Sequence, residues 1–109
     1  MTTHRVKNLV QHVQHYNTTW QKGIGALFQQ PIKDTAHVFP FPRTRPAFHS
    51  WFFNKAFDIV FLQEQTVVQT ATIQPFSTIT PSEPVTAVIE LPLGTVQKHD
   101  VKTGDTLIL

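Results

Sequence analysis

Two stretches of sequence decide the fold: Phe57-Asp58-Ile59-Val60-Phe61-Leu62 and Thr66-Val67-Val68-Gln69-Thr70-Ala71-Thr72-Ile73. Both are rich in β-branched and aromatic residues, which favour β-strands. The first stretch is almost entirely apolar, as expected of a strand that is covered on both faces. The second alternates between polar and apolar residues after Val68, as expected of a half-exposed strand. Residues 63–65 between them have the length of a hairpin loop, so the two stretches predict an antiparallel pair.

The chain downstream of this hairpin predicts more sheet and a single turn of helix. Residues 86–91 and 106–109 have the composition of strands. Between them we expect one helical turn at 94–99, followed by a tight turn at 102–105. Because glycine adopts a positive φ without steric cost, Gly104 is expected to take that conformation in the turn.

The segment upstream of the hairpin is ambiguous. Apolar residues recur there at helical spacing: Val6, Leu9, Val10, Val13, Tyr16 and Trp20. This spacing predicts an amphipathic helix, whereas the β-branched and partly alternating residues at 9–16 also suit a strand. The local pattern alone favours the helix. Residues 18–27 predict a further short helix, with Thr18 or Thr19 as its N-cap and two glycines that weaken it.

Length and composition exclude several classes of protein. A chain of 109 residues has room for one hydrophobic core, so we expect a single domain over residues 1–109, with residues 1–8 as a loosely ordered tail. The absence of cysteine excludes disulfide scaffolds, thiol nucleophiles, iron–sulfur clusters and cysteine-bearing zinc sites. No apolar run reaches the roughly 20 residues of a membrane span, and no signal peptide is visible. We therefore expect a cytoplasmic protein that makes no contact with a membrane.

The charge pattern argues against nucleic-acid binding. The formal net charge is only +2, and the nine Lys and Arg residues are scattered along the sequence. Binding to a phosphate backbone needs several clustered basic side chains. We expect a small molecule or saccharide as the partner, no nucleic acid, and a monomer or weak homodimer as the assembly state.

Aromatic residues gather in the middle of the chain. Seven of the nine phenylalanines lie between residues 39 and 61, together with Trp51. These side chains either form the core, since aromatic residues dominate core burial, or line a groove for a planar ligand, a sugar face or a peptide. Both interpretations stay open, because successive side chains of a strand face opposite ways.

Three polar residues stand in apolar surroundings. His49 lies among large apolar residues, and Asp58 is its nearest candidate partner, either in a structural pair or in an acid–base pair. Glu90 is the one acid in an apolar strand, where such a residue usually faces solvent or pairs with an arginine, here Arg43 or Arg45. A carboxyl with a raised pKa in a pocket is the alternative for Glu90.

The sequence predicts no metal site and no cofactor. His12 and His15 have a chelating spacing on a helix but face opposite ways on a strand, and no third ligand lies nearby. The motifs of nucleophilic hydrolases, phosphate-binding loops, dinucleotide-binding folds and zinc proteases are all absent. Whether the chain has any enzymatic activity is left open, with a non-enzymatic protein favoured.

Residues 48–62 resemble the signature H-T-F-F-M-x-F-P-I-D-V-V-F-L of an uncharacterised family, domain of unknown function 192. The direct matches are His49, Phe52, Asp58, Val60, Phe61 and Leu62. Residues 87–95 resemble the V-L-E-L-P-A-G-T segment of that family, residues 101–105 its L-K-V-G-D segment, and residues 20–27 its R-x-x-G-L-M segment. The three stronger motifs occur in the family's order and cover much of the chain.

Several positions depart from the family pattern. Phe53 replaces its methionine, Ala56 and Phe57 replace the proline before Ile-Asp, Gln63 replaces its aspartate, and Gln21-Lys22 stand where it has an arginine. A site built on that methionine or arginine would not transfer to this chain. The resemblance implies a compact, mostly β domain with short helices, and it implies a strand rather than a helix at 9–16.

The predicted fold class is α+β and mostly β, with a small, curved, barrel-like and largely antiparallel sheet and one or two short helices. The predicted function is a non-enzymatic module that binds a saccharide, small metabolite or peptide in an aromatic-lined groove. Its predicted ligand-binding residues are Arg45, His49, Trp51, Asp58 and Glu90. One alternative is a small hydrolase or lyase with His49 as base and Asp58 to orient it. Another is a structural or partner-stabilising protein.

Overall fold

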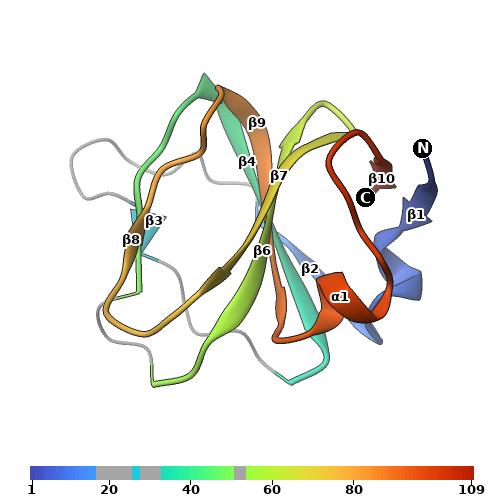
Figure 1. The fold of residues 1–109 in the computed structure, drawn as a ribbon, viewed down its shortest axis with the longest axis horizontal. Helices are drawn as coiled ribbons and strands as arrows, with labels where there is room; N and C mark the ends of the chain where they lie inside the picture. Colours follow the sequence, from blue (N-terminus) through green and yellow to red (C-terminus); the bar gives the residue numbers. More distant parts are fainter. Residues whose placement is uncertain (17–25, 28–32, 51–53) are drawn as a thin grey trace.

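A computed structural model describes residues 1–16, 26–27, 33–50 and 54–109. Two sheets and little helix make up the described chain (Figure 1). The larger sheet has seven strands, in the spatial order β1 (Thr3–Arg5), β10 (Thr106–Ile108), β7 (Thr66–Ile73), β6 (Phe57–Gln63), β9 (Val85–Pro92), β4 (Thr35–Thr44) and β2 (His12–His15). The smaller sheet has the order β3 (Ala26–Leu27), β5 (Phe48–His49) and β8 (Thr78–Ile79). The helical elements are the 3-10 turn η1 (Val6–Asn8) and the four-residue helix α1 (Thr95–Lys98).

The seven-stranded sheet is curled into a half-barrel, and its five middle strands are antiparallel. Only the two outer strands pair in parallel, β1 with β10 and β2 with β4. The predicted fold class is therefore confirmed: the protein is mostly β, with a curved, largely antiparallel sheet and one short α-helix. No helix in the described part of the chain is long and apolar enough to cross a membrane.

The two faces of the large sheet carry separate cores, because successive side chains of each strand point to opposite faces. The hydrophobic cluster on one face is entirely aliphatic, and we call it the aliphatic core; Val60 and Leu62 of β6 belong to it. The other face, here called the aromatic core, contains Phe39, Phe48, Phe57 and Phe61 together with aliphatic neighbours. Strand β6 is buried on both faces, which explains its nearly continuous apolar sequence.

The N-terminal segment differs from the local prediction. Residues 12–15 form the strand β2, so the strand implied by the family resemblance is confirmed and the helix favoured by the local pattern is wrong. The expected loose tail at residues 1–8 is also corrected, because β1 pairs with β10 and Val6 is buried in the aliphatic core. Part of the helical spacing has a different cause, because Val6, Leu9, Val10 and Val13 of η1, the following turn and β2 all pack on the aliphatic core, whereas Tyr16 packs on the aromatic core.

Most of the other predicted elements are confirmed. The hairpin joins β6 to β7 through a tight turn in which Glu64 has a φ of 56°. The third strand is β9, the helical turn is α1, and Gly104 has the expected positive φ of 94°. The helix predicted over 18–27 falls mainly outside the described residues, and its last two residues belong to strand β3 instead.

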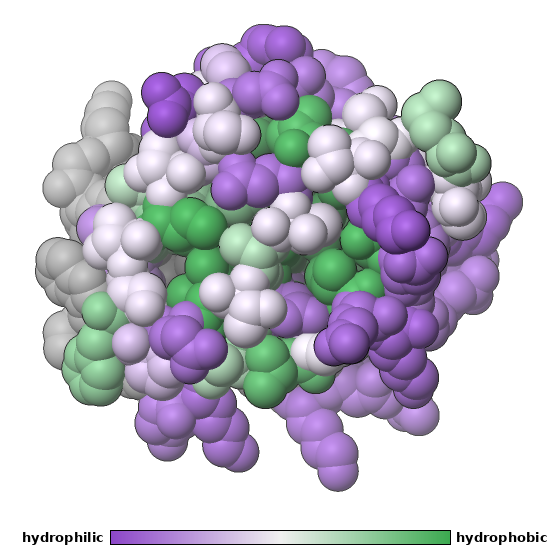
Figure 2. Space-filling model, viewed as in Figure 1, coloured by the Kyte–Doolittle hydropathy of each residue, from purple (hydrophilic) through white to green (hydrophobic). Residues whose placement is uncertain are grey.

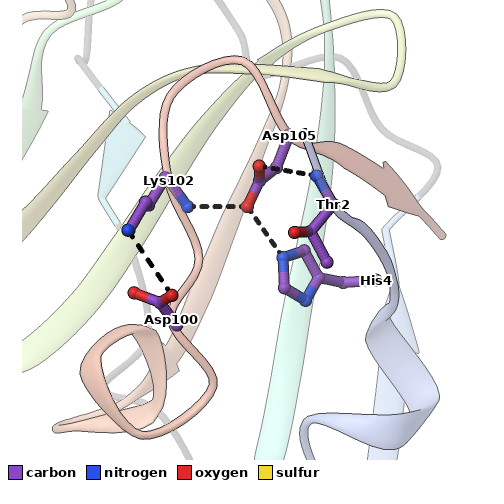
Figure 3. A network of polar contacts seen from close by, with 5 residues as sticks. All are labelled: Thr2, His4, Asp100, Lys102 and Asp105. Carbon is purple, nitrogen blue, oxygen red and sulfur yellow. Dashed lines mark hydrogen bonds and ion pairs between the residues drawn. The ribbon is translucent and has the colours of Figure 1, made fainter.

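Asp105 fastens β1 to the turn before β10 (Figure 3). Its Oδ1 accepts a hydrogen bond from the backbone N–H of Thr2 at 3.0 Å, and its Oδ2 accepts one from the N–H of Lys102 at 3.0 Å. The same Oδ2 lies 2.9 Å from Nε2 of His4. The hydrogen bonds from His4 and from the two backbone N–H groups lower the pKa of Asp105 from its ordinary value of 3.8 to about 2.

Candidate functional site

Asp58 has a structural position on the aliphatic side of the sheet. Its Oδ1 accepts a hydrogen bond from the Thr72 hydroxyl at 3.1 Å, and its Oδ2 accepts one from the backbone N–H of Val96 at 2.9 Å. Val96 lies in the first turn of α1, whose amide groups have no partner within the helix. Asp58 therefore connects the hairpin to the start of α1.

The predicted pairing of His49 with Asp58 is not formed. The carboxylate of Asp58 is engaged by Thr72 and Val96, on strand β7 and helix α1. His49 belongs to the small sheet, where its Nδ1 lies 3.0 Å from the hydroxyl of its cross-strand neighbour Thr78. The two residues are close in sequence but belong to different sheets, His49 to the small sheet and Asp58 to the large one.

Arg45 is hydrogen-bonded to the segment before β9 rather than to another predicted site residue. Arg45 is exposed, and its Nε donates a hydrogen bond to the carbonyl of Pro81 at 2.9 Å, which ties the segment after β4 to the segment before β9. Trp51 lies outside the described residues. Within the described chain, the predicted groove residues are thus dispersed rather than gathered at one site.

Glu90 departs most from its predicted surroundings. The residue is 0% exposed, and neither carboxyl oxygen has a hydrogen-bond partner among the described residues. The expectation of a solvent-facing or arginine-paired acid is therefore wrong. The side chain points into the aromatic core, because Glu90 lies opposite Ile59 of β6 and His37 of β4. Burial raises the pKa of Glu90 well above its ordinary value of 4.5, so the carboxyl favours its protonated form.

His37 and Tyr16 complete a polar cluster on this face. The Nδ1 atom of His37 is hydrogen-bonded to the Tyr16 hydroxyl at 2.8 Å. The two rings stack at a centroid distance of 5.8 Å, and the Tyr16 ring stacks on Phe39 at 4.5 Å. His37 is fully buried whereas Tyr16 is only half-buried. We call Glu90, His37 and Tyr16 the Glu90 cluster.

The electrostatics of the Glu90 cluster favour neutral groups. Burial lowers the pKa of His37, which disfavours its imidazolium form. Burial, and next the nearby charge of an ionised Glu90, raise the pKa of Tyr16. A protonated carboxyl can both donate and accept a hydrogen bond, so the Glu90 cluster offers donors and acceptors without a net charge.

His37 and Tyr16 were not predicted as site residues. Their grouping with Glu90 depends on the pairing of β2 with β4 and of β4 with β9. One local signal exists for His37, which is the polar residue of the apolar run 36–39. Its alternation with Val38 places His37 on the same face as Phe39.

The described residues contain no group of three or more His, Cys, Asp or Glu side chains arranged to hold a metal ion.

On the view shown in Figure 2, apolar side chains are exposed in small areas separated by polar ones, and hydrophilic side chains dominate the lower and right-hand edges. The large apolar residues with high exposure are Met1, Phe76, Leu93 and Leu109.

Nearly the whole chain matches one known protein family. The sequence model of DUF192, described as an uncharacterized ACR, matches residues 2–109. The chain belongs to the DUF192 family. This membership confirms the resemblance found in residues 48–62, 87–95 and 101–105.

Two curated relatives of this DUF192 chain are UPF0127 proteins from archaea. The protein from Pyrococcus abyssi is 30% identical over 87 residues, which are 78% of this chain and 74% of that protein. The protein from Pyrococcus furiosus is 28% identical over 86 residues, which are 77% of this chain and 74% of that protein.

Two solved structures resemble the DUF192 fold seen here. A putative transcription regulator from Sinorhizobium meliloti has a TM-score of 0.63 at 26% identity, covering 73% of this chain and 67% of that one. A protein of unknown function from Novosphingobium aromaticivorans has a TM-score of 0.70 at 20% identity, covering 86% of this chain and 71% of that one. The second likeness concerns the fold alone.

Proposed function

We propose that this DUF192 chain is a non-enzymatic module that binds a small molecule at the Glu90 cluster. The observation that carries the proposal is the carboxyl of Glu90, which is completely buried while neither oxygen has a partner among the described residues. A buried polar group without a hydrogen bond costs on the order of 1–3 kcal/mol, and such groups are rare in folded proteins. A ligand that supplies the missing hydrogen bonds would account for an acid at this position.

The chemistry of the Glu90 cluster suggests the class of ligand. The carboxyl requires a partner with N–H or O–H donors, such as a primary amide, an amidine or a sugar hydroxyl pair. The half-buried ring of Tyr16 is the part of the cluster nearest to solvent, so a ligand would enter beside it. Tyr16 and Phe39 also offer stacked aromatic rings, which suit a ligand with a flat or apolar body.

Two other functions receive less support. Catalysis by His49 and Asp58 would need the two residues in contact, whereas Asp58 is engaged by Thr72 and Val96. The Sinorhizobium meliloti protein is named as a putative transcription regulator. For this chain a net charge of +2 with dispersed basic residues favours a small-molecule ligand over nucleic acid.

Titration with benzamide tests the proposal, because benzamide presents an N–H donor and a carbonyl acceptor to a protonated carboxyl. We expect benzamide to shift the backbone amide resonances around His37 and Glu90 in a saturable way. The matched control is N,N-dimethylbenzamide, which keeps the ring and the carbonyl but has no N–H group. Benzamidinium is a second probe, because its cationic amidinium would bind Glu90 if the carboxyl ionises on binding.

The variant Glu90→Leu fills the same space without a carboxyl and should abolish the benzamide response. Its own spectrum reports whether the sheet is intact. The proposal fails if neither benzamide nor benzamidinium shifts these resonances, or if Glu90→Leu binds benzamide as well as the parent does.

A further inference from the structure

A cavity of about 220 Å³ lies where the half-barrel stays open, between its outer strands β1 and β2. Arg5 of β1, Lys7 of η1 and His15 of β2 contribute its polar lining, and Val13 and Ile108 contribute apolar lining. None of the lining side chains is acidic. Three basic side chains from three different elements therefore surround one partly apolar space.

These basic side chains have no acidic partner in the described chain. The two ion pairs found there are His4 with Asp105 and Lys102 with Asp100, and neither involves a residue of the cavity. Arg5 and Lys7 are both exposed, and neither forms an ion pair with a side chain of the described chain. Two unpaired positive side chains beside one cavity attract an anion to it.

We propose that this cavity binds a small organic anion, with a carboxylate held by Arg5 and Lys7 and an apolar body against Val13 and Ile108. The guanidinium of Arg5 matches a carboxylate with two parallel N–H donors, and Lys7 adds a charge without strict geometry. An apolar cavity of about 150 Å³ is large enough for benzene. The space here is larger, so an aromatic or short aliphatic monocarboxylate has a suitable size.

The proposed anion site is independent of the Glu90 cluster. Val13 packs against the aliphatic core, whereas Glu90 points into the aromatic core on the other face of the sheet. The two sites also prefer opposite ligands, because the Glu90 cluster requires a hydrogen-bond donor and the cavity requires an anion. Failure of one proposal therefore leaves the other intact.

Benzoate is the probe for the anion site, and benzyl alcohol is the matched neutral probe. We expect benzoate to shift the amide resonances of Val13, His15 and Ile108 in a saturable way, with weaker binding at higher salt. Benzyl alcohol should bind at least about tenfold more weakly, a difference of about 1.4 kcal/mol. Inorganic phosphate is an anion without an apolar body, so it measures the contribution of charge alone. It should also bind more weakly than benzoate.

The variants Arg5→Gln and Lys7→Gln should each weaken benzoate binding by about tenfold while leaving the melting temperature close to that of the parent. Lys98→Gln, on the exposed side of α1, removes the same charge away from the cavity and should leave binding unchanged. The proposal is overturned if benzyl alcohol or phosphate binds as tightly as benzoate. It is also overturned if Lys98→Gln weakens binding as much as Arg5→Gln does.

Discussion

Glu90 and His37 lie directly opposite each other on the paired strands β9 and β4, and both side chains are completely buried. Opposite residues of an antiparallel pair point to the same face, so the carboxyl and the imidazole share the aromatic core. His37 has the Tyr16 hydroxyl as a partner, whereas the carboxyl of Glu90 has none among the described residues. The buried side-chain polar atoms without a partner in the described chain are thus the two carboxyl oxygens of Glu90, on an inner strand of the large sheet.

Replacing Glu90 with leucine should stabilise the protein. Leucine is apolar and of similar size, so it removes an unsatisfied carboxyl without opening a cavity. We expect the free energy of unfolding at pH 7 to rise by about 1–3 kcal/mol, measured by urea denaturation. Ile89→Ala, in the neighbouring buried position, should instead destabilise by about 2–5 kcal/mol. A loss of stability in Glu90→Leu would mean that the carboxyl has a partner that stabilises it.

The buried carboxyl of Glu90 should also make stability depend on pH. Its pKa is higher in the folded state than the ordinary 4.5, so the folded protein keeps a proton that the unfolded chain releases. The contribution of Glu90 to the free energy of unfolding should therefore be most favourable below about pH 4.5. It should fall as the pH rises toward the pKa of Glu90 in the folded state. The limiting slope is about 1.4 kcal/mol per pH unit. The difference between parent and Glu90→Leu isolates this contribution, and a difference that is constant with pH would contradict it.

Asp58 should prove important for stability rather than for binding. Asp58→Ala leaves the N–H of Val96 and the hydroxyl of Thr72 without their acceptor, so we expect a loss of about 1–3 kcal/mol. Asp58→Asn retains one acceptor oxygen and should lose less. Unchanged denaturation midpoints in Asp58→Ala would rule out this structural role.

Asp105 should hold the N-terminal strand in place. In Asp105→Asn the side chain retains one acceptor oxygen and loses its charge, which weakens the contacts to Thr2, His4 and Lys102, so we expect a lower melting temperature. The folded pKa of about 2 lies below the ordinary 3.8, so this stabilisation is present above pH 3.8 and is lost as the pH falls toward 2. Asp100→Asn is the control, because its ion pair with Lys102 is exposed and contributes little.

Gly104 should be required for the turn before β10. Its φ is 94°, and a β-carbon built there has only Met1 Cγ within contact distance, at 4.0 Å. The penalty for Gly104→Val is therefore backbone strain, expected to be roughly 1–2 kcal/mol, and it should lower the melting temperature. Lys102→Ala, in the same turn, removes only an exposed side chain and should have little effect. Equal melting temperatures for the parent and Gly104→Val would contradict the left-handed turn.

Much of the fold could be predicted because its central elements are local in sequence. Strands β6 and β7 follow one another through a tight turn, and their apolar and alternating patterns match their burial on two faces or one. The strand β9, the helix α1 and the positive φ of Gly104 also carry local signals. These elements needed no knowledge of distant partners.

The N-terminal segment and the Glu90 cluster could not be predicted in this way. Strands β1 and β2 pair in parallel with distant strands, and nothing in residues 3–15 identifies β10 or β4 as partners. Asp58 stands at the start of one apolar strand and Glu90 lies within another, and the two side chains point to opposite faces of the sheet. Asp58 has hydrogen-bond donors because Thr72 and the start of α1 lie on its face of the sheet, whereas Glu90 meets no donor among the described residues on the other face.

The pairing of β1 with β10 determines when the sheet can be completed during protein synthesis. Thr3 pairs with Thr106, so the ribosome must translate nearly the whole sequence before the first strand has a partner. At about 5–20 residues per second this delay is roughly 5–20 seconds. During that time Val6, Leu9 and Val10 lack the strand that anchors them over the aliphatic core, which makes the nascent chain a candidate for chaperone binding. Residues 3–5 are made before the rest of the sheet and gain their partner strand only when β10 has been made.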